Sequence, residues 1–170
     1  MEQNVGFSVE TNQAMRALLG QEALNPTLIR GPLPSGMAEA GGVSEGFADL
    51  DGCVVPIRWL AKAVDKNRDD ETGLECLLSK IHVGDFVDES TTPLDQMIRL
   101  GIAYAHVLRN GLLASRVKGP FRIIVSGLLG NDDDAATCTV RFHRRRAGQD
   151  WLNHDLEGYS REALMVWDFD

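Results

Sequence analysis

The chain has 170 residues, of which 44% are hydrophobic and 25% charged, which suits one globular domain with a hydrophobic core. The formal net charge of -8 at pH 7 argues against a general nucleic-acid-binding protein, because an acidic surface repels phosphate. We therefore expect a single domain over residues 1–170 that has no nucleic-acid partner.

The N-terminal part of the chain predicts one helix and one irregular segment. Apolar residues recur at helical spacing over residues 11–19, and Gly20 is a suitable stop. Residues 25–52 are rich in glycine and proline, which opposes a continuous helix or strand. We interpret them as a flexible functional loop, with a segment draped over the core as the alternative.

Three further helices are expected before residue 115. Pro56 fits the first turn of a short helix, and leucines at three- and four-residue spacing predict another over residues 71–81. These two helices are expected to pack as a hairpin. The longest predicted helix has Thr92 as its candidate N-cap and keeps one apolar face as far as Leu112. Gly101 within it would allow close packing against another element.

After residue 120 the apolar period changes from near four to two, which is typical of strands. Residues 121–126 and 138–143 alternate in polarity, and the turn between them predicts a hairpin. A nearly continuous apolar run at 163–169 predicts a third strand that is covered on both faces. The predicted fold class is α+β, with N-terminal helices followed by a C-terminal antiparallel sheet of at least three strands packed on the long helix.

Charge is distributed unevenly along this hairpin. Residues 116–146 contain seven Arg or Lys against three Asp, a net charge of +4 in an acidic chain. Arginines gather at the far end of the second strand, and we expect them to pair with acidic residues of the next loop, namely Asp150, Asp155 and Glu157. The acidic residues instead form the turn, where they could insert into a basic active site of another protein. They are Asp132, Asp133 and Asp134.

Two aromatic residues, Trp151 and Tyr159, flank a polar and acidic stretch after the hairpin. Such residues are enriched at protein interfaces, and they are equally suited to cover the edge of a sheet. The candidate partner-binding residues are therefore Asp132, Asp133, Asp134, Trp151 and Tyr159.

Sequence patterns that signal catalysis or cofactor binding do not occur. There is no GxGxxG after a strand, no GxxxxGK[ST] and no GxSxG. Cys53, Cys76 and Cys138 lack the spacing of metal ligands and lie among apolar neighbours. We expect buried thiols in a reducing cytosol, with no catalytic residue, no metal site and no cofactor.

Membrane signals are also missing from the sequence. No apolar run approaches the roughly 20 residues needed to span a bilayer, and residues 1–4 lack the character of a signal peptide. We expect a cytoplasmic protein without a membrane partner.

The leading hypothesis is a non-enzymatic, acidic interaction protein of a bacterial type. One form would be an immunity protein or inhibitor that binds and neutralises a basic protein such as a toxin. The alternative is a small enzyme or ligand-binding domain with a pocket between the long helix and the sheet. Its titratable candidates are His82, Asp85, His106 and His143.

Overall fold

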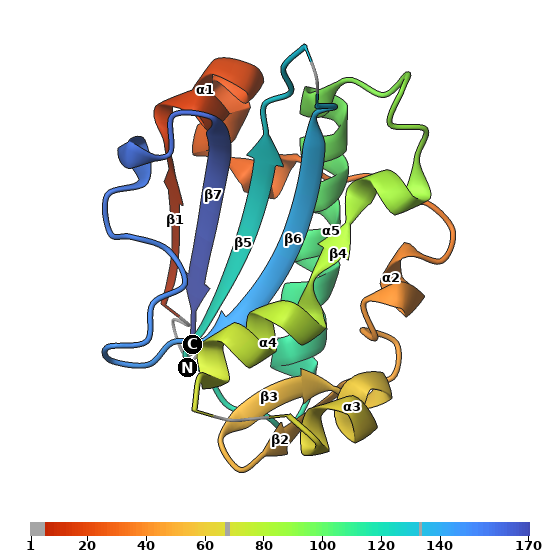
Figure 1. Ribbon diagram of the computed structural model, residues 1–170, viewed down its shortest axis with the longest axis vertical. Coiled ribbons are helices and arrows are strands. Elements are labelled where there is room, and N and C mark those ends of the chain that lie inside the picture. Colours follow the sequence, from red (N-terminus) through yellow and green to blue (C-terminus); the bar gives the residue numbers. More distant parts are fainter. Residues whose placement is uncertain (1–5, 67–68, 133) are drawn as a thin grey trace.

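The computed structural model describes residues 6–66, 69–132 and 134–170. Its centre is an antiparallel sheet of five strands in the order β1-β7-β5-β6-β4, with the long helix α5 packed across one face (Figure 1). The predicted α+β fold class is confirmed, including the hairpin of β5 and β6. The strands of this sheet are β1 (Phe7–Thr11), β4 (Ile81–His82), β5 (Phe121–Leu128), β6 (Thr137–Arg144) and β7 (Glu162–Phe169).

Two strands of the sheet were not predicted from the sequence. β1 pairs along its length with β7, so that Phe7 lies opposite Phe169 at the other end of the chain. β4 contains only two residues, which pair with Val140 and Thr139 of β6. Both are short segments whose strand conformation depends on partners that lie far away in the sequence.

Helix α5 (Leu94–Ala114) confirms the long predicted helix. Its N-cap is Pro93 and not Thr92, because Pro93 combines a φ of -60° with the extended ψ of 150° that a cap residue adopts. A Cβ added at Gly101 would lie 3.2 Å from side-chain atoms of β5 and β6. The predicted close approach at Gly101 is therefore confirmed, and it is made to the sheet.

The face of the sheet opposite α5 is covered by the connection between β6 and β7. Leu152, Leu156 and Tyr159 of this connection pack against Leu164 and Val166 of β7. The alternate residues of β7 belong to the main core beneath α5. This double cover explains the nearly continuous apolar sequence of β7, and the prediction of a strand buried on both faces is confirmed.

Helix α4 (Glu71–Ser79) runs along the edge of β6 that β4 leaves unpaired. The hydroxyl of Ser79 donates to the Phe142 carbonyl at 3.0 Å and accepts the Phe142 N–H at 2.9 Å. The carboxylate of Glu75 accepts the N–H of Arg144 at 2.8 Å. Side chains of a helix therefore satisfy the backbone groups that an edge strand would otherwise pair with.

A smaller layer lies beside α4 and has its own core. Its elements are β2 (Phe47–Leu50), β3 (Cys53–Pro56), the 3-10 helix η3 (Ile57–Trp59) and α3 (Leu60–Val64). Cys53, Val55, Ala63 and Leu74 form the buried cluster that joins α3 to α4. The predicted pair of short helices is confirmed, although the first begins as η3 because Pro56 ends the strand β3.

The N-terminal helix α1 (Gln13–Leu19) ends at Gly20, whose φ of +59° confirms it as the predicted stop. The Gly/Pro-rich segment that follows lies along α5, and we call residues 25–46 the strap. The 3-10 helix η1 (Gly20–Leu24) follows α1 directly, and the strap contains η2 (Pro26–Leu28) and α2 (Met37–Ala40). Another 3-10 helix, η4 (Val83–Phe86), follows β4.

Two contacts show how closely the strap packs on α5. Met37 of α2 is fully buried, and a Cβ added at Gly41 would lie 1.7 Å from the hydroxyl oxygen of Tyr104. The segment is therefore draped over the helix, which was the alternative interpretation of its composition. Its flexibility stays a prediction.

Two further sequence expectations concern the environment of the chain. None of the helices within residues 6–66, 69–132 and 134–170 is long and apolar enough to cross a membrane. Cys53, Cys76 and Cys138 are all buried, as predicted. Burial raises the pKa of Cys76 and of Cys138 to about 12, so both thiols stay protonated at neutral pH.

Replacing Gly41 with Ala should destabilise the protein by about 1–3 kcal/mol, because the added methyl group meets a buried aromatic hydroxyl that has little room to move. The backbone at Gly41 has a φ of -76°, so strain in the main chain does not contribute. Urea denaturation monitored by circular dichroism measures the change.

Gly31→Ala is the matched control, because a Cβ added there meets nothing within 4 Å. Adding Tyr104→Phe to Gly41→Ala should recover part of the loss, since it removes the nearest atom. Equal stability of the Gly41→Ala and Gly31→Ala proteins would contradict the close packing of the strap.

Candidate interaction surface

The basic end of the β5–β6 hairpin is neutralised within the molecule. Arg146 binds Glu75 through two contacts of 2.8 Å, and the Glu75 side chain is fully buried. Arg146 also lies 3.1 Å from Glu71. Two further arginines of this end pair with carboxylates of other segments, Arg144 with Asp49 at 2.8 Å and Arg122 with Asp168 at 2.7 Å.

The prediction that these arginines pair with Asp150, Asp155 and Glu157 was wrong. Among the described residues, Glu157 pairs with Arg16, and Asp150 lies 3.6 Å from His154. Asp155 caps the short helix η5 (Leu156–Gly158). The loop that carries these acids turns over the outer face of the sheet, whereas α4 and the β2–β3 hairpin reach the end of β6.

The Glu75 carboxylate also accepts the backbone N–H of Val54 at 2.6 Å and that of Arg144 at 2.8 Å. Together with Arg146, these donors compensate the loss of hydration that burial of a charge imposes. One carboxylate thus holds α4, β3 and the end of β6 together.

The acidic turn lies at the end of the molecule where α5 begins (Figure 1). Asp132 and Asp134 are exposed, and the N–H of Asp134 donates to the Asn131 side chain at 2.8 Å. Asp133, the third predicted residue of the turn, lies outside the described residues. The sequence analysis thus located a charged, solvent-exposed turn, and its role in binding stays a prediction.

A second acidic segment reaches the same end of the molecule. The η4 helix packs against β6 and α5, and the chain from η4 to α5 reaches the same end of the molecule in Figure 1. It contains Asp85, Asp88 and Glu89, which are exposed, and Asp95 follows in the first turn of α5. We call Asp85, Asp88, Glu89, Asp95, Asp132 and Asp134 the acidic end.

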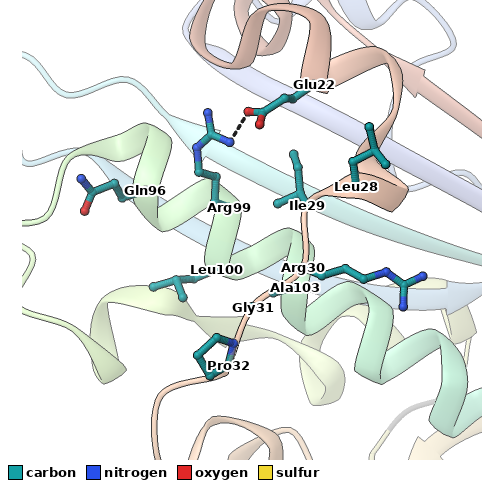
Figure 2. Close-up of a pocket in the computed structure, with 10 residues that line it drawn as sticks. All are labelled: Glu22, Leu28, Ile29, Arg30, Gly31, Pro32, Gln96, Arg99, Leu100 and Ala103. Atoms are coloured by element: carbon teal, nitrogen blue, oxygen red, sulfur yellow. Dashed lines mark hydrogen bonds and ion pairs between the residues drawn. The ribbon is translucent and has the colours of Figure 1, made fainter.

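A groove of about 470 Å³ lies between α5 and the strap (Figure 2). Arg99 spans its rim, where it pairs with Glu22 and lies 4.0 Å from Asp95. The floor and walls are mainly apolar. Figure 2 shows Glu22, Leu28, Ile29, Arg30, Gly31, Pro32, Gln96, Arg99, Leu100 and Ala103 around it.

The two predicted aromatic residues lie on the outer face of the sheet. Trp151 is 41% exposed, and its ring is 5.0 Å from the Arg141 guanidinium. Tyr159 packs into the cluster beneath the β6–β7 connection, and its hydroxyl accepts the N–H of Asn153 at 3.0 Å. Tyr159 therefore covers the outer face of the inner strands, whereas the sequence interpretation placed it over an edge of the sheet. A binding role for Trp151 stays a prediction.

The four titratable candidates of the alternative hypothesis are not brought together in one pocket. His143 is buried on the outer face of the sheet, and His106 of α5 lies against the ring of Trp167, with 4.7 Å between ring centroids. His82 and Asp85 are exposed. In the described residues no group of three His, Cys, Asp or Glu side chains could hold a metal ion.

The space between α5 and the sheet is filled by buried side chains. Ile98, Ile102 and Leu108 of α5 and Val125 and Val140 of the sheet belong to one core cluster and are at most 1% exposed. The groove in Figure 2 instead opens on the strap side of α5. Sequence analysis missed it because the strap carries no periodic pattern that would place it on the helix.

The antiparallel sheet with one long helix across it defines the chain as an α+β domain. The chain belongs to the Uncharacterized protein PM0498 family, whose model matches residues 10–170. The match includes the acidic end, the groove and the Glu75 network. No curated protein and no solved structure matches the chain.

Replacing Glu75 with Gln should lower the free energy of unfolding by about 3 kcal/mol or more, because Arg146 then loses its buried counter-charge. The matched control is Glu71→Gln. Glu71 also contacts Arg146, but its side chain is 29% exposed, so the loss should stay below about 1 kcal/mol. Urea denaturation measures both changes, and losses of equal size would contradict the central role of Glu75.

Stability should fall as the pH drops below 6.5, because burial lowers the pKa of His143 and of His106 below their ordinary value of 6.5. The unfolded chain then binds protons that the folded chain does not. The stability that the neutral rings confer is complete above pH 6.5 and is lost progressively below it.

The free energy of unfolding measured from about pH 7.5 to about pH 5.5 checks this. His143→Gln should reduce the slope over this interval. His154→Gln is the control, because the His154 side chain is 94% exposed. A slope that His143→Gln leaves unchanged would show that this ring does not contribute.

Proposed function

We propose that this protein is a non-enzymatic interaction domain that binds a basic protein partner. The observation that carries the proposal is the separation of charge. Two acidic segments that are far apart in the sequence reach one end of the molecule (Figure 1), whereas Arg122, Arg144 and Arg146 at the other end of the β5–β6 hairpin form ion pairs within the protein. We place this function in the cytoplasm, which the three buried thiols support.

The charge of the acidic end is largely uncompensated. Among the described residues, Asp85, Glu89 and Asp132 form no ion pair, and the chain carries a net charge of -8. Such a surface attracts a positively charged partner over a distance and accelerates the encounter. The attraction also fixes the orientation in which the two proteins meet.

The adjoining groove supplies the apolar part of the surface. Leu28 is 72% exposed beside it, and Leu24 of η1 is 64% exposed. A volume of about 470 Å³ is large enough to take apolar side chains of a partner, and side chains anchored in pockets dominate most interface energies. The surface therefore combines charged residues, which would accelerate association with the partner, and apolar residues, which would stabilise the complex.

An immunity protein or inhibitor is the specific form that we favour. The β5–β6 turn extends beyond the body of the sheet (Figure 1), as an acidic element must if it is to enter a basic active site. A partner that acts on an anionic substrate would have such a site. Occupying it with carboxylates would block the substrate.

The size of the groove favours ligand binding as a second candidate function. Small-molecule pockets occupy about 300–1,000 Å³ and are mainly apolar with a few polar groups, a description that the residues in Figure 2 satisfy. In that case binding of the ligand would depend on Leu100 and Ile29 and would be insensitive to the acidic end.

The test is to capture partners from a lysate of the source organism and to measure association with the purified partner at low ionic strength. A variant with Asp85→Asn, Glu89→Gln and Asp132→Asn should associate about tenfold more slowly and unfold at the same urea concentration as the wild type. Added salt should reduce the difference.

Glu10→Gln, Glu39→Gln and Asp65→Asn together are the matched control, because all three side chains are exposed and lie outside the acidic end. It should associate at the wild-type rate. Recovery of acidic proteins alone, or equal rates for all three proteins, would contradict the proposal.

A further inference from the structure

A small depression of about 160 Å³ lies between α3 and α4, on the layer beside the sheet. Its lining consists of Trp59, Lys62, Leu77, Leu78 and Lys80. The depression is thus apolar at its floor and carries lysines from two elements. It is separate from the groove on the strap side of α5, and no residue lines both.

The lysine of α3 is held in place by the aromatic ring. The Lys62 ammonium lies 4.2 Å from the centroid of the Trp59 ring, and the Arg58 guanidinium lies 5.2 Å from it. Cations at these distances are attracted to the negative face of the ring. Lys62 is therefore positioned at the depression before any ligand arrives, which reduces the entropy that binding costs.

The lysines of the depression differ from the arginines of the hairpin. Within the described residues neither Lys62 nor Lys80 forms an ion pair, although the chain as a whole is acidic. Leu77 is 57% exposed and precedes Lys80 by three residues, so the two side chains are neighbours at the end of α4. An unpaired cation thus stands next to an exposed aliphatic side chain.

We propose that this α3–α4 surface binds an acidic peptide segment of a partner protein that bears one aliphatic side chain. The aliphatic side chain occupies the depression, and carboxylates on either side of it contact Lys62 and Lys80. We choose an acidic partner on the basis of charge complementarity, because Lys62 and Lys80 form no ion pair within the described residues.

The size of the depression and the position of Lys62 over the Trp59 ring argue against a small molecule or a nucleic acid as the occupant. Pockets for small molecules begin at about 300 Å³, so 160 Å³ admits little more than a side chain. Nucleic-acid bases stack on open aromatic faces, whereas Lys62 occupies a face of Trp59. The proposal does not rest on the acidic end, since the two surfaces carry opposite charge and share no residue.

Titration of the 15N-labelled full chain with the synthetic peptide Ac-EELEE-NH2 tests the proposal by nuclear magnetic resonance. The indole N–H signal of Trp59 should shift, whereas that of the fully buried Trp167 should not. Ac-EEGEE-NH2 should bind roughly tenfold more weakly, because it lacks the aliphatic anchor, and Ac-KKLKK-NH2 should not bind.

Lys62→Ser with Lys80→Ser should weaken binding of Ac-EELEE-NH2 roughly tenfold. The matched control, Arg116→Ser with Lys118→Ser, removes two exposed cations elsewhere on the chain and should bind as the wild type does. Proteins with intact far-ultraviolet circular dichroism are compared, so that loss of folding is distinguished from loss of the site.

Several results would overturn the proposal. They are an unshifted Trp59 signal, equal binding of the leucine and glycine peptides, and full binding by the Lys62→Ser, Lys80→Ser protein. A Trp59 signal that moves on dilution without peptide would assign the surface to a second copy of the chain. A larger shift with an oligothymidylate than with the peptide would assign it to single-stranded nucleic acid.

Discussion

The buried carboxylate of Glu75 is the constraint on which the arrangement of the smaller layer depends. A charge without access to water is tolerated only when donors surround it, and here the donors come from β3, from the end of β6 and from Arg146. If β3, the end of β6 or Arg146 moves away from α4, the Glu75 carboxylate loses a hydrogen-bond donor. The requirement therefore fixes α4 against the sheet edge more specifically than apolar contacts alone would.

The position of α4 has consequences on both of its sides. Towards the sheet, Ser79 and Glu75 satisfy the backbone groups of β6, so this edge is closed to the addition of another strand. Away from the sheet, the same orientation turns Leu77 and Lys80 outward, towards α3. Glu75 and Leu77 thus lie on different faces of one helix, and Lys80 follows at its C-terminal end.

The elements that the sequence predicted are those whose pattern is contained within the element. The long apolar face of α5 and the alternation in β5 and β6 need no knowledge of distant residues. β1 is different, because five residues become a strand only by pairing with β7 at the other end of the chain. The strap also depends on its partner, since its glycines and prolines fit α5 without any period of their own.

The candidate surface also has a part that the local sequence predicts and a part that depends on the fold. The acidic turn is local and was found from three consecutive residues, whereas its neighbours between η4 and α5 join it only through the fold. The arginine partners were predicted within the next loop, but Glu75 precedes Arg146 by 71 residues. A signal did exist in the sequence, because Glu75 lies between Leu74 and Cys76 on the apolar side of a helix. A charge at such a position requires a buried counter-charge.

The internal pairing of arginines leaves the net charge of -8 unchanged, but it holds positive charges away from the acidic end. Arg122, Arg144 and Arg146 are engaged at the opposite end of the sheet, with Asp168, Asp49 and Glu75. The dipole of α5 favours Asp95 in its first turn, whereas Asp85, Glu89 and Asp132 form no ion pair within the described residues. A partner that brings cations to this end would supply the missing counter-charges. Binding and folding stability would then be linked, because the folded chain alone assembles carboxylates from separate segments.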